Sequence, residues 1–249
     1  MVVVSLPRVT DATRDEATDG SQDGLLDLFG LLAYAELVAF FRLSGDAALA
    51  PSLSEKAELA GMAVAEFGHF TLLRDRIASL NVRPEQAMLP FMAALDAFHA
   101  RTEPSDWLEG LVKAYVGDGI AADFYRAIAE LLDPPSRELV LSVLADTGHA
   151  EFVTARVRAA IKADPAVAGR LALWARRLVG EALAQAHRVA AERPPLARLL
   201  ASGAGRDPAA HPQGEIGRMF ARLTDAHEER MAALGLAGWE KPDGEGATD

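Results

Sequence analysis

Apolar residues recur every three or four positions along most of the chain, and no convincing run alternates between apolar and polar positions as a strand does. Such spacing places the apolar side chains on one face of a helix, where they can form a core. The pattern therefore predicts an all-α protein. The predicted helices cover residues 23–43 with a stop at Ser44-Gly45, then Ser52 or Ser54 to Asn81, 84–102 as a shorter connector, 105–132, 136–163, 165–192 and 214–234.

The order of these helices predicts a domain organisation. Two long helical hairpins joined by a connector are the layout of a four-helix bundle with one long crossover. We expect that bundle, with its connector and a fifth helix, over residues 23–191, and a C-terminal helical extension over residues 192–238. Residues 1–22 and 239–249 are polar and carry no period, so we expect flexible tails there.

An acid and a histidine stand three positions apart in two places, as Glu66 and His69 in EFGH and as Asp146 and His149 in DTGH. Residues three apart lie on the same face of a helix, so each pair can reach one ion. Both pairs also fall on the apolar stripe of their helix, where an ionised carboxylate is unfavourable unless a cation compensates its charge. The two motifs together predict a metal site in the core of the bundle.

The first and third long helices should each supply one more carboxylate. Glu36 is the candidate in the first helix, because apolar positions surround it on its helix face. In the third helix, Asp118 stands 82 residues after Glu36, close to the offset of 80 between the two motifs, whereas Asp123 stands 87 residues after it. We therefore favour Asp118 over Asp123. The full predicted ligand set is Glu36, Glu66, His69, Asp118, Asp146 and His149.

This repeated pattern, an acid followed about 30 residues later by acid-x-x-His, resembles the ferritin-like di-iron carboxylate proteins. Within that superfamily the segments GDGIAADFY and LADTGHAEF resemble hydroxylases that act on methylthio-isopentenyl-adenosine in tRNA, over roughly residues 25–190. The resemblance implies an oxygenase with two iron ions, or possible manganese, with dioxygen as co-substrate and an electron-donating reductase as partner. The second half carries Asp118 and Asp146 where the family usually has Glu, which implies a looser half-site.

The amino-acid composition narrows the kinds of metal ligand and binding partner that the chain can have. The chain has no cysteine, which excludes thiolate metal ligands and disulfide bonds. The net charge of -11 argues against a nucleic-acid partner, yet residues 156–222 hold 12 Lys and Arg against 5 Asp and Glu. That stretch could contact the phosphates of a tRNA, with Arg176 and Arg177 among the contacts, or it could be the solvated face of two helices.

No apolar run reaches the roughly 18 residues that cross a bilayer, so we expect a soluble, cytoplasmic protein with no membrane partner. A homo-oligomer with negative surfaces would suit an iron-oxidising or peroxide-consuming function. Two other functions stay open: an iron-oxidising or peroxide-consuming protein without an organic substrate, and a degenerate bundle that serves as an interaction module.

Tyr34 and Tyr115, near Glu36 and Asp118 in the sequence, are candidates for hydrogen bonding at the site, although core packing is the commoner role.

Overall fold

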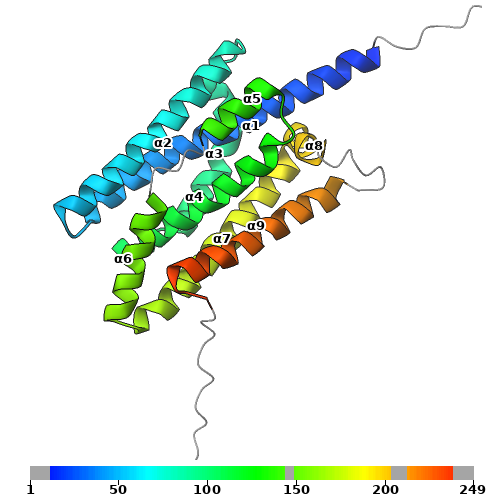
Figure 1. Ribbon diagram of the computed structural model, residues 1–249. Coiled ribbons are helices and arrows are strands. Elements are labelled where there is room, and N and C mark those ends of the chain that lie inside the picture. Colours follow the sequence, from blue (N-terminus) through cyan, green and yellow to red (C-terminus); the bar gives the residue numbers. More distant parts are fainter. Residues whose placement is uncertain (1–11, 144–148, 203–211, 238–249) are drawn as a thin grey trace, which may run out of the picture.

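The computed structural model describes residues 12–143, 149–202 and 212–237, and every regular element in these ranges is a helix. The predicted all-α class is therefore confirmed. In chain order the helices are α1 (Ala12–Leu49), α2 (Leu53–Ser79), α3 (Pro84–Arg101), α4 (Trp107–Ala129), α5 (Pro134–Ser142), α6 (His149–Ala163), α7 (Ala166–Glu192), α8 (Pro194–Ser202) and α9 (Pro212–Leu234) (Figure 1).

Polar residues explain where several of these helices begin. The Ser52 hydroxyl accepts a hydrogen bond from the backbone N–H of Glu55 at 3.2 Å, so Ser52 rather than Ser54 caps α2. Asp106 caps α4 by accepting from a backbone N–H, and Asp133 caps α5 in the same way. Each cap satisfies a backbone donor that the first turn of a helix leaves without a partner.

Two apolar layers follow one another along the bundle. Helix α1 packs along α2 and α3, while α4 packs against α7 and α9 (Figure 1). One layer includes Phe29, Leu73 and Ile128, and the other includes Leu43, Leu59 and Leu111. Along their own helices, Glu36, Glu66 and Asp118 all fall between the two layers. The fold therefore brings these acids to the same height in the bundle.

Helix α1 is longer than predicted at both ends. It begins at Ala12, inside the stretch 1–22 where we expected a flexible tail, and it continues past the predicted stop at Gly45 to Leu49. The apolar pattern misses the first part because that stretch has no apolar stripe, yet extending an existing helix adds one hydrogen bond per residue fixed. A glycine inside a helix costs only about 1 kcal/mol. The helix ends instead just before Pro51, which disfavours helical geometry in the residue that precedes it.

The predicted fourth long helix, residues 136–163, is not one element. Helix α5 ends at Ser142 and α6 begins at His149, and the two helices point in different directions (Figure 1). Thr147 and Gly148, which stand between them in the sequence, are weak helix formers. The apolar spacing on either side did not reveal this interruption, so the prediction of a continuous helix was wrong.

The C-terminal extension consists of α8, which the apolar pattern did not predict, and α9, which covers the predicted 214–234.

One stretch of α1, Gln22–Leu49, is long and apolar enough to cross a membrane, contrary to the expectation from the sequence. Half of its most apolar window is nevertheless buried inside the molecule. One side of this stretch of α1 therefore packs inside the described part of the molecule.

Candidate metal centre

Three side chains of the kinds that ligate metals converge between the two apolar layers. Glu36 of α1 and Glu66 and His69 of α2 each offer one ligand atom, and these atoms all lie within 4.8 Å of one another. Nδ1 of His69 is 3.5 Å from Oε2 of Glu36 and 3.5 Å from Oε2 of Glu66. Both carboxylates are buried, and the imidazole is half-buried. The acid and histidine of the first motif thus share one helix face and meet the carboxylate of α1.

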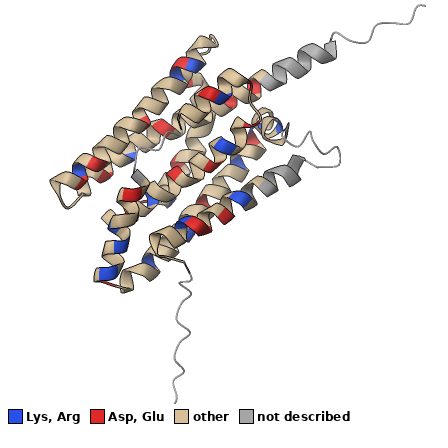
Figure 2. Cartoon of the chain, viewed as in Figure 1, with Lys and Arg blue, Asp and Glu red and all other residues tan. Residues whose placement is uncertain are grey.

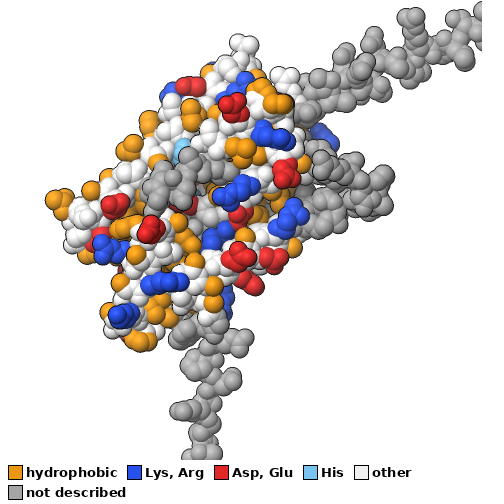
Figure 3. Space-filling view, in the orientation of Figure 1, with side chains coloured by type: hydrophobic (Ala, Val, Ile, Leu, Met, Phe, Trp, Pro, Cys, Tyr) orange, Lys and Arg blue, Asp and Glu red, His pale blue; other side chains and the backbone are white. Residues whose placement is uncertain are grey.

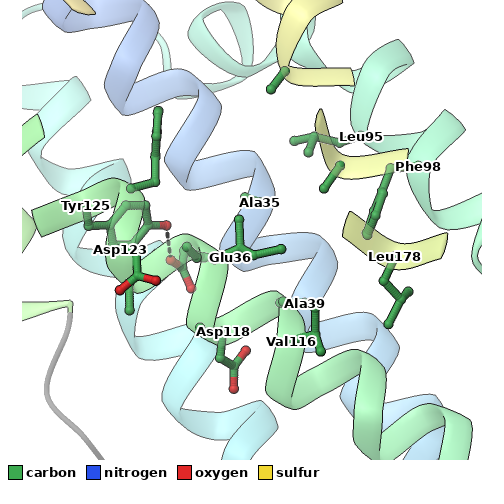
Figure 4. A pocket seen from close by; sticks show the side chains of 18 of the residues that line it. Ala35, Glu36, Ala39, Leu95, Phe98, Val116, Asp118, Asp123, Tyr125 and Leu178 are labelled. Atoms are coloured by element: carbon green, nitrogen blue, oxygen red, sulfur yellow. Dashed lines mark hydrogen bonds between the residues drawn. The ribbon is translucent and has the colours of Figure 1, made fainter. Parts of the chain in front are cut away.

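Helix α4 brings a third acid, Asp118, to the wall of the cavity beside this cluster. Burial and the charge of Glu66 raise the pKa of Asp118 well above its ordinary value, while His69 opposes that rise. Asp123, the alternative, lines the same cavity (Figure 4), but its carboxylate accepts hydrogen bonds from Arg230 of α9 at 2.6 Å and from Arg126 at 2.9 Å. Residues five apart on a helix point roughly 140° away from one another, which accounts for the different neighbours of the two aspartates.

Tyr125 of α4 orients Glu36. Its hydroxyl donates a hydrogen bond to Oε1 of Glu36 at 2.5 Å in a buried position (Figure 4). The sequence pattern pointed to Tyr34 and Tyr115 and not to this residue. Tyr34 donates instead to an acid of α3 at 2.7 Å, and Tyr115 packs against an apolar layer. The position of Tyr125 seven residues after Asp118, on the same face of α4, is the signal that could have identified it.

The electrostatics of the cluster are those of a site with too much negative charge. Burial and the adjacent Glu36 raise the pKa of Glu66 to about 7, against the opposing effect of His69. Burial alone would lower the pKa of His69, but the hydrogen bonds and charges of Glu36 and Glu66 outweigh it and raise that pKa to about 10. One imidazolium cannot neutralise two buried glutamates and the nearby Asp118. A cation bound among them would complete the balance.

The second motif lies largely outside the described residues. Asp146 is one of residues 144–148, which the structure does not describe. His149 is the first residue of α6, and its side chain also lies outside the description. Among the described residues, the predicted ligands that converge are therefore Glu36, Glu66 and His69, and Asp118 lines the cavity beside them.

A cavity of about 620 Å³ adjoins the cluster, within the size range of small-molecule sites in proteins. The predicted ligands of α1, α2 and α4 line it, as does Tyr125. Most of the remaining wall is apolar, so the cavity can hold a hydrocarbon part of a molecule next to the carboxylates. The apolar lining labelled in Figure 4 consists of Ala35, Ala39, Leu95, Phe98, Val116 and Leu178.

Many arginines of the basic stretch 156–222 have partners within the protein. Their contacts are Arg156 to Glu55 at 3.2 Å, Arg158 to the backbone oxygen of Ala233 at 2.7 Å, Arg170 to Glu109 at 2.5 Å, Arg177 to the backbone oxygen of Arg101 at 2.6 Å, Arg188 to Glu192 at 2.9 Å, and Arg193 to Asp27. Basic and acidic residues are also intermixed over the helices of the molecule (Figure 2). On the face seen in Figure 3 they lie scattered among acidic and hydrophobic side chains.

Comparison with known proteins identifies a family that shares this fold. A protein family described as "Ferritin-like domain, actinomycetes" matches residues 20–203, about three quarters of the chain. The matched range holds all six predicted ligands and the described cluster. None of the curated proteins matches the chain.

Proposed function

The chain belongs to the ferritin-like domain family of actinomycetes, and from that premise we propose that it is a non-haem di-iron oxygenase that hydroxylates an apolar organic molecule. The ferritin-like fold expected from the sequence is thereby confirmed, whereas the finer likeness to tRNA hydroxylases stays a proposal. One observation carries the function: the carboxylate and histidine cluster opens onto a mainly apolar cavity large enough for an organic molecule.

The donor set fits iron. Carboxylate oxygens and imidazole nitrogens are ligands that suit iron, and manganese shares the preference for carboxylates. Glu36 and Glu66 are buried within ligand distance of each other, an arrangement that a divalent cation would relieve. His69 would have to be neutral to bind, so ion binding must displace its proton. The residues proposed to hold two ions are Glu36, Glu66, His69 and Asp118, with Asp146 and His149 from the second motif.

When bound, a pair of iron ions would supply the redox chemistry that activates dioxygen towards a C–H bond. Hydroxylation places one oxygen atom in the substrate and releases the other as water, which consumes two electrons and two protons. We therefore propose a reductase as electron donor. The protein's own contribution is to orient Glu36 through Tyr125 and to surround the reacting carbon with apolar side chains that exclude water.

The cavity favours an organic substrate over iron oxidation alone, since an iron-oxidising centre has no use for an apolar chamber of this size. It also favours a small molecule over a tRNA base. The basic stretch 156–222 would have to supply the phosphate contacts, and many of its arginines already bind acids or backbone oxygens of the same protein. We therefore propose tRNA only as the second candidate substrate.

The direct test uses the full chain loaded with ferrous iron and supplied with a chemical reductant. We expect dioxygen uptake that is matched by a hydroxylated product when an apolar probe such as a long-chain alkane derivative is present. Glu66→Gln should abolish both signals, because it removes a charged ligand from the cluster. Glu58→Gln, the same change at an exposed position of α2, is the matched control and should retain both.

Each other outcome identifies a different function. Dioxygen uptake that yields only ferric iron would favour the iron-oxidising alternative. Hydroxylation of tRNA, with none of the apolar probe, would favour the second candidate substrate. Equal uptake by Glu66→Gln and the parent chain would remove the cluster from the chemistry altogether.

A further inference from the structure

The cavity beside the metal centre has a second polar region, formed by Lys113 of α4 and His99 of α3. Lys113 stands five residues before Asp118, so the two are about 7.5 Å apart along the axis of α4 and point roughly 140° away from each other, yet both line the cavity. Phe98 and Leu178 line the cavity as well, and both appear in Figure 4. One chamber thus holds a cationic group, an apolar wall and the carboxylate cluster.

Lys113 is buried in an unusual way, because lysines with so little exposed surface are ordinarily paired with an acid. Only 8% of the residue is exposed, and none of the ion pairs among the described residues includes it. Its Nζ donates to the backbone oxygen of Thr102 at 2.6 Å and lies 5.6 Å from the centre of the Phe98 ring. The nearby Glu103 is instead paired with Arg42 at 2.9 Å. The charges of Glu103 and Asp46 act on the ammonium group without a direct ion pair, so it keeps donor capacity for a further partner.

His99 adds a second group that lacks a partner. Its Nδ1 is buried and makes no hydrogen bond within the described part of the chain. The ring stands edge-on to Phe98 with the centroids 5.0 Å apart, which holds it at the cavity wall. A buried polar atom without a hydrogen bond is costly, so a ligand that supplied one would be favoured.

We propose that the cavity binds an elongated apolar carboxylic acid, with the carboxylate held by Lys113 and His99 and the hydrocarbon chain extending past Phe98 and Leu178 to the carboxylate cluster. This proposal rests on the proposed function, which makes the carboxylate cluster the place where the hydrocarbon chain reacts. The hydrocarbon would meet the apolar wall, while its charged end would meet the ammonium group of Lys113.

The charges around Lys113 favour a carboxylate over a phosphate. The Arg42 guanidinium already faces Glu103, so the ammonium of Lys113 is the cation left to face a ligand there. Asp46 also lines this region, and a doubly charged phosphate would be repelled by its carboxylate. Burial raises the pKa of Asp46, which lessens the repulsion of a single negative charge.

The burial of Lys113 also has a purely structural explanation. Thr102 follows the last turn of α3, and the carbonyl of Thr102, which accepts the hydrogen bond from Lys113, is one that a helix end leaves without a partner in the helix. The two roles predict different results. A cap alone would make Lys113 important for stability but indifferent to ligands, whereas a binding group must distinguish an acid from the corresponding alcohol.

The experiment compares dodecanoate with dodecanol by titration calorimetry on the full chain, with and without iron. We expect the parent chain to bind dodecanoate at least tenfold more tightly than dodecanol. Lys113→Met should remove that preference by weakening only dodecanoate, and Lys113→Arg should keep most of it. Lys162→Met, at an exposed position of α6, is the matched control and should bind both probes as the parent chain does.

Equal affinity of the parent chain for the two probes would overturn the proposal, even if Lys113→Met failed to fold. So would an unchanged dodecanoate affinity in Lys113→Met. Binding at Lys113 needs no iron, so a preference for dodecanoate in the iron-free chain would stand if the metal centre failed. A chain that takes up iron and consumes dioxygen without binding dodecanoate would keep the centre and lose this substrate class.

Discussion

Glu36 owes its orientation to a neutral donor, the hydroxyl of Tyr125. Groups that orient metal ligands in this way typically contribute 10- to 100-fold to metal affinity. Tyr125→Phe should therefore weaken iron binding by about tenfold or more while leaving the fold intact. Tyr34→Phe removes a hydroxyl that bonds to an acid outside the cluster and serves as the control. Iron titrations that coincide for the two variants would contradict this role of Tyr125.

A second prediction at this scale concerns acid stability. Burial, together with the charges of Lys113 and Arg42, lowers the pKa of His99 from 6.5 to about 3. The unfolded chain therefore takes up a proton at His99 that the folded chain refuses, so this contribution to stability is complete above pH 6.5 and is lost as the pH falls towards 3.

His99→Phe should make the urea midpoint less sensitive to pH below 6.5 than it is in the parent chain. His227 titrates in the same sense, since burial and Arg230 lower its pKa to about 4, but that effect is common to both proteins and cancels in the difference. Midpoints that fall in parallel for parent and variant would refute the assignment to His99.

Among the helices, α1 offers the sharpest contrast between two glycines. A Cβ atom on Gly30 would lie 2.1 Å from the backbone oxygen of Ala87, so Gly30 is what allows α1 and α3 to pack closely. Gly30→Ala should destabilise the protein by about 1–3 kcal/mol or more through overpacking. Gly45→Ala, with open space around its Cβ, should stabilise the helix by about 0.5–1 kcal/mol. Unfolding free energies of the same sign for both variants would contradict this packing.

A helix boundary could be predicted from the sequence where nearby residues mark it. The apolar spacing located the middle of α1, and the two serines Ser52 and Ser54 bracketed the start of α2, because both signals are local. The start of α1 at Ala12 was missed because a helix can continue without an apolar stripe. The division between α5 and α6 was missed because the apolar positions on either side of it keep their spacing.

Across the whole molecule, the candidate site was predictable where sequence spacing sets geometry. Glu66 and His69 share a helix turn, and their meeting with Glu36 follows from the order of apolar layers along antiparallel helices. The hydrogen bond from Tyr125 and the buried Lys113 depend on how α4 sits against α1 and α3, which no spacing within one helix encodes. The cavity is likewise a property of the assembled bundle.

The measurement that tests the central claim most directly is the iron content of the purified chain after reconstitution with ferrous iron and removal of the excess. The proposed centre predicts close to two ions per chain, a melting temperature that rises with iron, and loss of both effects in Glu66→Gln but not in Glu58→Gln. Iron well below one ion per chain, with melting indifferent to the metal, would contradict a di-iron centre and leave the bundle as an interaction module.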